Sequence, residues 1–211
     1  MGFGWLFTGY FFAFVMPIYS PLSFAMPVGY LMMLWGLFQL AHYHKRYEIC
    51  FYFTLLSLPL SVYYALHAFT DFGLLSNLSI LSGSFYTVVD WIYFGFAAVF
   101  HCLLLYATAG LCDEVGLPAL QATAWRNFIL MVAYDVVGCV SRLPIPILAE
   151  NAGYVALPMI LLRFLTVFLN LYLLYRAYRL ICPEGEEMMP LEDENKKVQK
   201  SLHQIDAGGE E

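Results

Sequence analysis

Five ionisable side chains stand inside long apolar stretches of this sequence, where membrane hydrocarbon is the expected surrounding. They are Asp90, His101, Asp135, Arg142 and Arg163. A charge at membrane depth costs a few kcal/mol on insertion scales, so such residues normally face protein or water and often mark a functional site. These residues are therefore the candidates for chemistry in this chain.

Three of them, Asp90, Arg142 and Arg163, are expected at similar depths in one half of the membrane. Counting about 1.5 Å per helical residue from the expected helix ends places them roughly 9–13 Å deep. The planar guanidinium of arginine matches a carboxylate or a phosphate. The three residues predict a pocket for a small anion that opens to the outside.

The other two, His101 and Asp135, are expected at a common depth in the inner half, roughly 12–14 Å from the inner face. A buried carboxyl beside an imidazole is an arrangement that relays protons. We therefore consider this pair a candidate proton or ion relay.

A purely structural interpretation competes with both sites. Arg142 is followed by Leu-Pro-Ile-Pro, which should end a helix there, so its charge can simply face a helix C-terminus or reach the headgroups. A single tie between Asp90 and an arginine would explain most of the pattern without a ligand.

The segments that carry these residues predict an all-α, polytopic bundle of transmembrane helices. The 211-residue chain is 61% hydrophobic and only 12% charged, which leaves more apolar surface than a soluble domain can cover. The expected segments are 3–19, 22–43, 49–69, 84–111, 127–148 and 154–181. Because the first is short for a span, five spans plus an interfacial N-terminal helix are the alternative. We expect a short interfacial helix in the connector 112–126.

Charge divides the chain into two parts, a transmembrane domain over residues 1–182 and an acidic tail over 183–211. The first part balances seven acidic residues against seven Lys and Arg, whereas the tail holds nine acidic residues and three lysines. We expect the tail to be disordered and cytoplasmic, and to be the place where a protein partner would bind.

Composition also bounds the partners and cofactors. The lipid bilayer is the expected surrounding, and no basic surface suggests nucleic acid. The five cysteines form no CxxC pair, and His42 and His44 point nearly opposite ways on a helix, so we expect no metal site and no cofactor.

Lysine and arginine predict the orientation. With alternating segments, the connectors on one side hold Lys45, Arg46 and Arg126, with Arg176 and Arg179 at the last boundary on that side. The connectors on the other side hold none. The positive-inside rule then places both termini in the cytoplasm of a cell-membrane protein.

The N-terminal segments resemble an uncharacterised family of small bacterial multi-pass membrane proteins. The motifs are LFTGYFF at 6–12 and PVGYLMMLWGLFQLAHY at 27–43, about a fifth of the chain. The resemblance implies a multi-pass fold in a bacterial membrane and no activity.

Three functions remain open on the sequence. A small-solute transporter, or the membrane-embedded solute-binding subunit of one, is favoured by charges on several segments and by proline-interrupted helices. A non-catalytic partner, regulatory or structural subunit is favoured by the absence of a catalytic motif. A membrane enzyme is the least favoured, because no catalytic cluster is expected at a common depth.

Overall fold

The computed structural model describes residues 2–18, 20–71, 83–143 and 152–181. The predicted acidic tail lies outside these residues. The helical elements are α1 (Gly2–Tyr10), the π-helical turn η1 (Phe11–Val15), the 3-10 turns η2 (Met16–Ile18) and η3 (Ser20–Ala25), α2 (Met26–Ala41), α3 (Arg46–Asp71), α4 (Ser84–Glu114), α5 (Pro118–Ser141) and α7 (Ala152–Ile181). No β-strand occurs in these ranges, and the predicted all-α bundle is confirmed.

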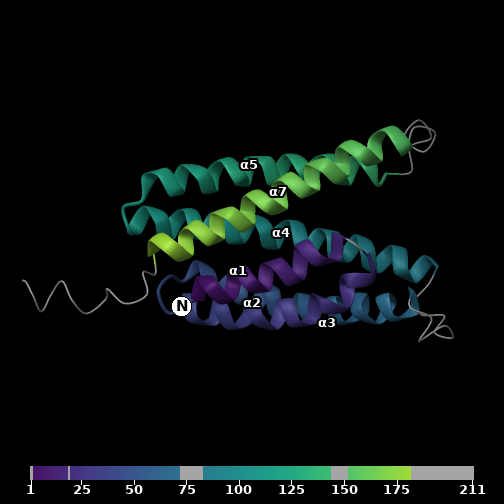
Figure 1. Ribbon diagram of the computed structural model, residues 1–211, viewed down its shortest axis with the longest axis horizontal. Coiled ribbons are helices and arrows are strands. Elements are labelled where there is room, and N and C mark those ends of the chain that lie inside the picture. Colours follow the sequence, from purple (N-terminus) through teal and green to yellow (C-terminus); the bar gives the residue numbers. More distant parts are fainter. Residues whose placement is uncertain (1, 19, 72–82, 144–151, 182–211) are drawn as a thin grey trace, which may run out of the picture.

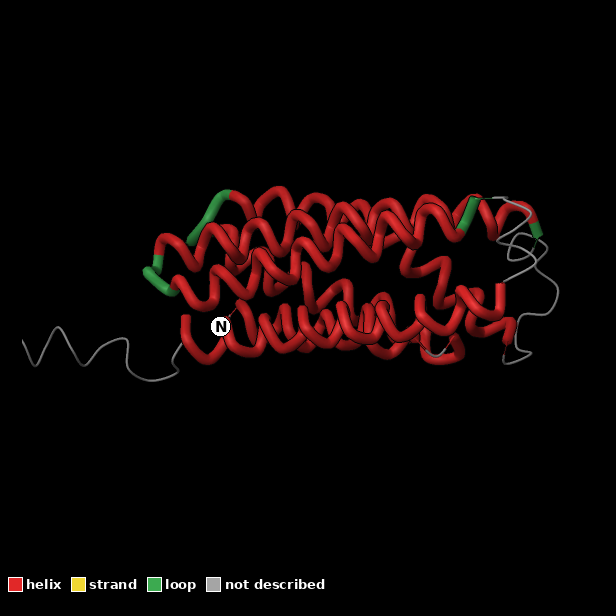
Figure 2. The backbone as a smooth tube through the Cα atoms, turned by 90° about the horizontal axis from the view of Figure 1, so that it is seen from above, coloured by secondary structure: helices red, strands yellow, loops and turns green. Residues whose placement is uncertain are grey.

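The helices run side by side along one long axis (Figures 1 and 2), and Figure 1 shows an upper and a lower group. One group contains α1, α2 and α3, and the other contains α4, α5 and α7. Contacts of α1 with α7 and of α3 with α4 join the groups. The N-terminus and the end of α7 lie at the same end of the bundle, together with the α2–α3 and α4–α5 turns (Figure 1).

Glycine allows α1 to lie directly against α2. A Cβ on Gly29 would be 2.5 Å from the backbone nitrogen of Ala13 and 2.7 Å from the carbonyl oxygen of Gly9. One heptad along, a Cβ on Gly36 would be 2.7 Å from the carbonyl oxygen of Gly2. Small residues permit this close backbone approach between membrane helices. We call the contact of Gly2 and Gly9 with Gly29 and Gly36 the glycine seam.

The N-terminal segment is an integral part of the core. Phe3, Leu6 and Tyr10 of α1 are completely buried, and Phe14 of η1 is 5% exposed. The segment Gly2–Ile18 is shorter than the other apolar segments. It nevertheless packs between α2 and α7 rather than lying apart from the bundle as an interfacial helix.

Among the described residues, four helical segments are long and apolar enough to cross a membrane: Leu22–Ala41, Arg46–Thr70, Ser84–Glu114 and Ala156–Ile181. In each of the last three segments, only 28% of the residues in an apolar stretch of 18 are buried within the protein. Most of this apolar surface faces outward, where water would be unfavourable and lipid is favourable. The chain is therefore an integral membrane protein with several spanning helices.

The predicted boundary of the fifth segment is wrong. Residues 118–126, expected in a separate interfacial helix, begin a continuous α5 that extends to Ser141. Proline is favourable at the first position of a helix, and Pro118 stands there. The turn before it needs only three residues because Gly116 adopts a φ of 72°, a left-handed conformation that glycine enters at low cost. The polar first half of α5 thus packs along the bundle.

The glycine seam predicts a substitution whose effect depends on position. Gly29→Ala should lower the free energy of unfolding by about 1–3 kcal/mol, because its methyl group meets the backbone of α1. Gly95→Ala, also within a helix, adds its methyl group to open space and should leave stability unchanged or raise it by up to about 1 kcal/mol. Thermal unfolding of both variants in detergent checks this. If Gly29→Ala and Gly95→Ala had equal unfolding temperatures, the packing of α1 against α2 would not depend on the glycine seam.

Candidate functional site

All five ionisable residues predicted from the sequence line one cavity between the two groups of helices. Its volume is about 210 Å³, and its walls come from the N-terminal turns and from α2, α3, α4, α5 and α7. Asp90 and His101 lie on α4, Asp135 and Arg142 on or just after α5, and Arg163 on α7. The predicted outer and inner groups therefore belong to one site.

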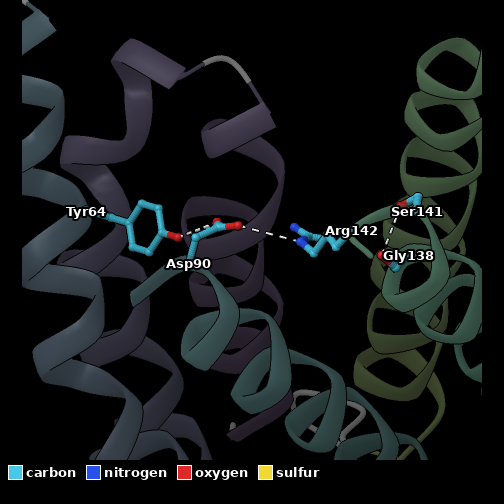
Figure 3. A network of polar contacts seen from close by, with 5 residues as sticks. All are labelled: Tyr64, Asp90, Gly138, Ser141 and Arg142. Atoms are coloured by element: carbon cyan, nitrogen blue, oxygen red, sulfur yellow. Dashed lines mark hydrogen bonds and ion pairs between the residues drawn. The ribbon is translucent and has the colours of Figure 1, made fainter. Parts of the chain in front are cut away.

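Asp90 and Arg142 form an ion pair at this site, with 3.5 Å between Nε and Oδ2. The side chains are 32% and 33% exposed, with Arg142 given first. Tyr64 of α3 donates a hydrogen bond of 2.7 Å to the other oxygen of Asp90, so the carboxylate lies between the phenol and the guanidinium (Figure 3). The contact ties α3, α4 and the end of α5 together, as the structural interpretation of the sequence predicts for Asp90 and an arginine.

Arg142 lies at the end of its helix. Helix α5 ends at Ser141, and the backbone nitrogen of Arg142 still donates to Cys139. The prediction that Leu-Pro-Ile-Pro ends the helix here agrees with this end. The expected fifth segment, 127–148, put Arg142 within a helix, whereas α5 ends at Ser141. Its guanidinium carbon stands 4.1 Å from the ring centroid of Phe94. A cation at a helix C-terminus and over an aromatic face is favourable on both counts.

Arg163 contrasts with Arg142. Its side chain is half-buried on the cavity wall, but its guanidinium forms no ion pair with another residue in the described ranges. The ion pair of Asp90 is made with Arg142, on a different helix. Arg163 therefore brings a positive charge to the cavity, and no carboxylate in the described part of the protein forms an ion pair with it.

His101 and Asp135 both face this cavity, but no hydrogen bond joins them. The His101 side chain is 3% exposed, and its Nδ1 lies 2.6 Å from the carbonyl oxygen of Ala97. Its Nε2 and the Oδ2 of Asp135 are both buried and have no partner among the described residues. The two residues share the cavity, but no direct relay contact joins them in this part of the chain.

The cavity also has contributors that sequence reasoning did not identify. Tyr64 holds Asp90, and Phe14 packs on the His101 ring with 4.4 Å between centroids. Nearby, Asn170 of α7 donates a 3.2 Å hydrogen bond to the buried hydroxyl of Tyr10. The position of Asn170 within an apolar helix is a sequence signal for a buried polar contact. Tyr64 carries no such signal, because it is one of sixteen tyrosines in the chain.

Comparison with known proteins identifies no relative, since no family model, curated protein or solved structure matches the chain. The resemblance of the N-terminal motifs thus stays a prediction. Within the described ranges, no group of three His, Cys, Asp or Glu side chains is placed to hold a metal ion. The chemistry available at the site is that of an ion pair, a further cation, a carboxyl, the imidazoles of His101 and His67, and several tyrosine phenols.

The ion pair makes a testable contribution to stability. Asp90→Asn should lower the free energy of unfolding by about 1–3 kcal/mol, because it leaves the charge of Arg142 uncompensated. The loss should be smaller than in a fully buried pair, where it reaches about 3–5 kcal/mol, because both side chains are partly exposed.

Adding Arg142→Gln to Asp90→Asn should restore much of the loss, since the double variant leaves no stranded charge. Asp113→Asn, an exposed acidic residue near the far end of α4, is the matched control and should change little. Thermal unfolding in detergent measures all three. Additive losses in the double variant would contradict a stabilising pair.

Proposed function

We propose that this protein binds a small solute within the membrane, as a transporter or as the membrane-embedded binding subunit of one. The observation that carries the proposal is the meeting of five ionisable residues, from three helices distant in sequence, at one cavity. Intramembrane ionisable residues are expensive and commonly mark solute or ion pathways. A site between helices of a bundle is also a usual location for ligand binding.

The size and lining of the cavity favour a small, polar ligand. Its volume of about 210 Å³ is below the roughly 300–1,000 Å³ of pockets for drug-sized ligands. The unpaired guanidinium of Arg163 supplies the group that would hold a carboxylate or phosphate. Because Asp90 neutralises Arg142, we expect Arg163 to be the main anion-binding residue.

A structural role accounts for only part of the arrangement. The Asp90–Arg142 pair, with Tyr64 and Phe94, is satisfied without a ligand and fits a tie between helices. The same explanation does not extend to Arg163 or to the unpartnered atoms of His101 and Asp135. These groups favour a solute-binding protein over a purely structural subunit or a subunit that only binds a protein partner. For such a partner, the acidic tail remains the proposed contact.

The orientation of the bundle is part of this proposal. Lys45 and Arg46 lie at the α2–α3 turn, and Arg176 and Arg179 lie in the last turns of α7, which is at the same end of the bundle (Figure 1). The positive-inside rule then makes this end cytoplasmic and brings both termini to that side of a cell membrane. Reporters fused at Asn77 and Glu211 should read opposite compartments; one compartment for both would overturn the orientation.

Binding can be tested without knowing the ligand. Purified protein in detergent should be stabilised by at least one member of a panel of small carboxylates, inorganic phosphate and amino acids. A ligand at ten times its Kd adds about 1.4 kcal/mol to the free energy of unfolding. Arg163→Gln should abolish the stabilisation, whereas Arg126→Gln, an exposed arginine outside the cavity lining, should retain it.

Failure of every panel compound to stabilise the unaltered protein would contradict the proposal. Stabilisation that is equal in Arg163→Gln and in the unaltered protein would place the binding elsewhere and would contradict the assignment to this cavity.

A further inference from the structure

Three polar groups on the cavity wall have no partner in the described part of the protein, and their charges and hydrogen-bonding roles differ. They are the guanidinium of Arg163, the Oδ2 of Asp135 and the Nε2 of His101. Buried polar groups are nearly always hydrogen-bonded to protein, water or ligand. That rule applies to the buried Asp135 Oδ2 and His101 Nε2, whereas Arg163 is half-buried and only lacks an ion pair. Two buried atoms without a partner and one cation without a counter-charge at one cavity indicate which groups a ligand would carry.

The role of His101 follows from its second ring nitrogen. A carbonyl oxygen can only accept, so the 2.6 Å contact with Ala97 means that Nδ1 carries the hydrogen and donates it. In the neutral ring, Nε2 is then an acceptor. Oδ2 of an ionised Asp135 is also an acceptor, whereas the guanidinium of Arg163 only donates. The wall thus presents two acceptors, one of them on a carboxylate, and one cationic donor.

From this complementarity we infer that the ligand is a zwitterion of amino-acid type, carrying an ammonium group and a carboxylate. Its ammonium donates to Asp135 and His101, and its carboxylate accepts from Arg163. The inference rests on the proposed function and narrows its ligand from small solutes in general to one chemical class. A simple anion would satisfy Arg163 but would leave both acceptors unpaired, which is costly at a buried site.

The remaining wall predicts the body of this ligand. Apolar surface beside the polar groups comes from Phe14, Met26, Ala97, Met131 and Val167, and the rest of the wall includes tyrosines and His67. The Asp90–Arg142 pair already satisfies its own charges, so it does not require a second anionic or cationic group on the ligand. A short hydrocarbon side chain on the zwitterion fits both the apolar wall and the limited volume.

Four probes with similar carbon skeletons separate the contributions of the two charges. They are norvaline and 5-aminopentanoate, which carry both charges, pentanoate, which carries only the carboxylate, and pentylamine, which carries only the ammonium group. Binding of each to the purified full-length protein in detergent is measured by titration calorimetry and by thermal unfolding. At least one zwitterion should bind about ten- to a hundredfold more tightly than either single-charge probe, since each loses charged hydrogen bonds.

Substitutions assign the charges to residues. Asp135→Asn should weaken zwitterion binding about ten- to a hundredfold and leave pentanoate binding unchanged, because Arg163 is retained. Arg163→Gln should weaken both. Asp113→Asn is the matched control, because it removes an exposed carboxylate near the C-terminal end of α4. It should change the binding of neither the zwitterions nor pentanoate. The four probes on the unaltered protein give the answer even if a variant fails to fold.

The outcomes separate this inference from the function on which it rests. Pentanoate binding as tightly as both zwitterions would overturn the inference and leave solute binding intact. Zwitterion binding that Asp135→Asn does not weaken would also overturn it. Absence of binding by these probes and by every compound of the wider panel would overturn both.

Discussion

The cost of a charge in hydrocarbon is the constraint on which this structure depends. Each ionisable residue that the sequence places at membrane depth must find protein, water or ligand as its surrounding. The bundle meets this requirement by turning Asp90, His101, Asp135, Arg142 and Arg163 toward one cavity, while the long apolar helices leave most of their surface for lipid. The arrangement of the helices and the location of the candidate site therefore have the same physical cause.

The N-terminal segment closes this cavity on one side, and the glycine seam makes that possible. Because Gly9 and Gly29 let two backbones touch, Tyr10 and Phe14 reach the rings of His101 and its neighbours. The helix widens into a π-turn at Phe11–Val15, next to the cavity that Phe14 lines. Turns of this kind often occur at functional sites. A segment that looks too short for a span thus contributes to the polar centre.

Much of the fold could be predicted from sequence because apolar length and charge exclusion are local signals. The helices containing Asp90, His101 and Arg163 agree with their expected ranges closely. The start of α5 differs from the prediction because the more polar residues 118–126 indicate a separate interfacial helix. In the structure they continue into α5, which packs against α4 and α7. Depth alone divided the five residues into an outer and an inner group, whereas the structure brings all five to one cavity. The choice of Arg142 over Arg163 as the partner of Asp90 likewise depends on helix rotation and packing that depth does not encode.

The central claim is that this charged cavity admits a small polar solute, and thiol accessibility tests it most directly. In a chain whose five cysteines are replaced, Ala98→Cys places a thiol on the cavity lining, and Ala107→Cys places one at a completely buried position of the same helix. The account predicts that a small, charged methanethiosulfonate reagent modifies the first thiol in membrane vesicles and leaves the second unmodified. No modification at either position would contradict it, because the cavity would then be closed to polar solutes.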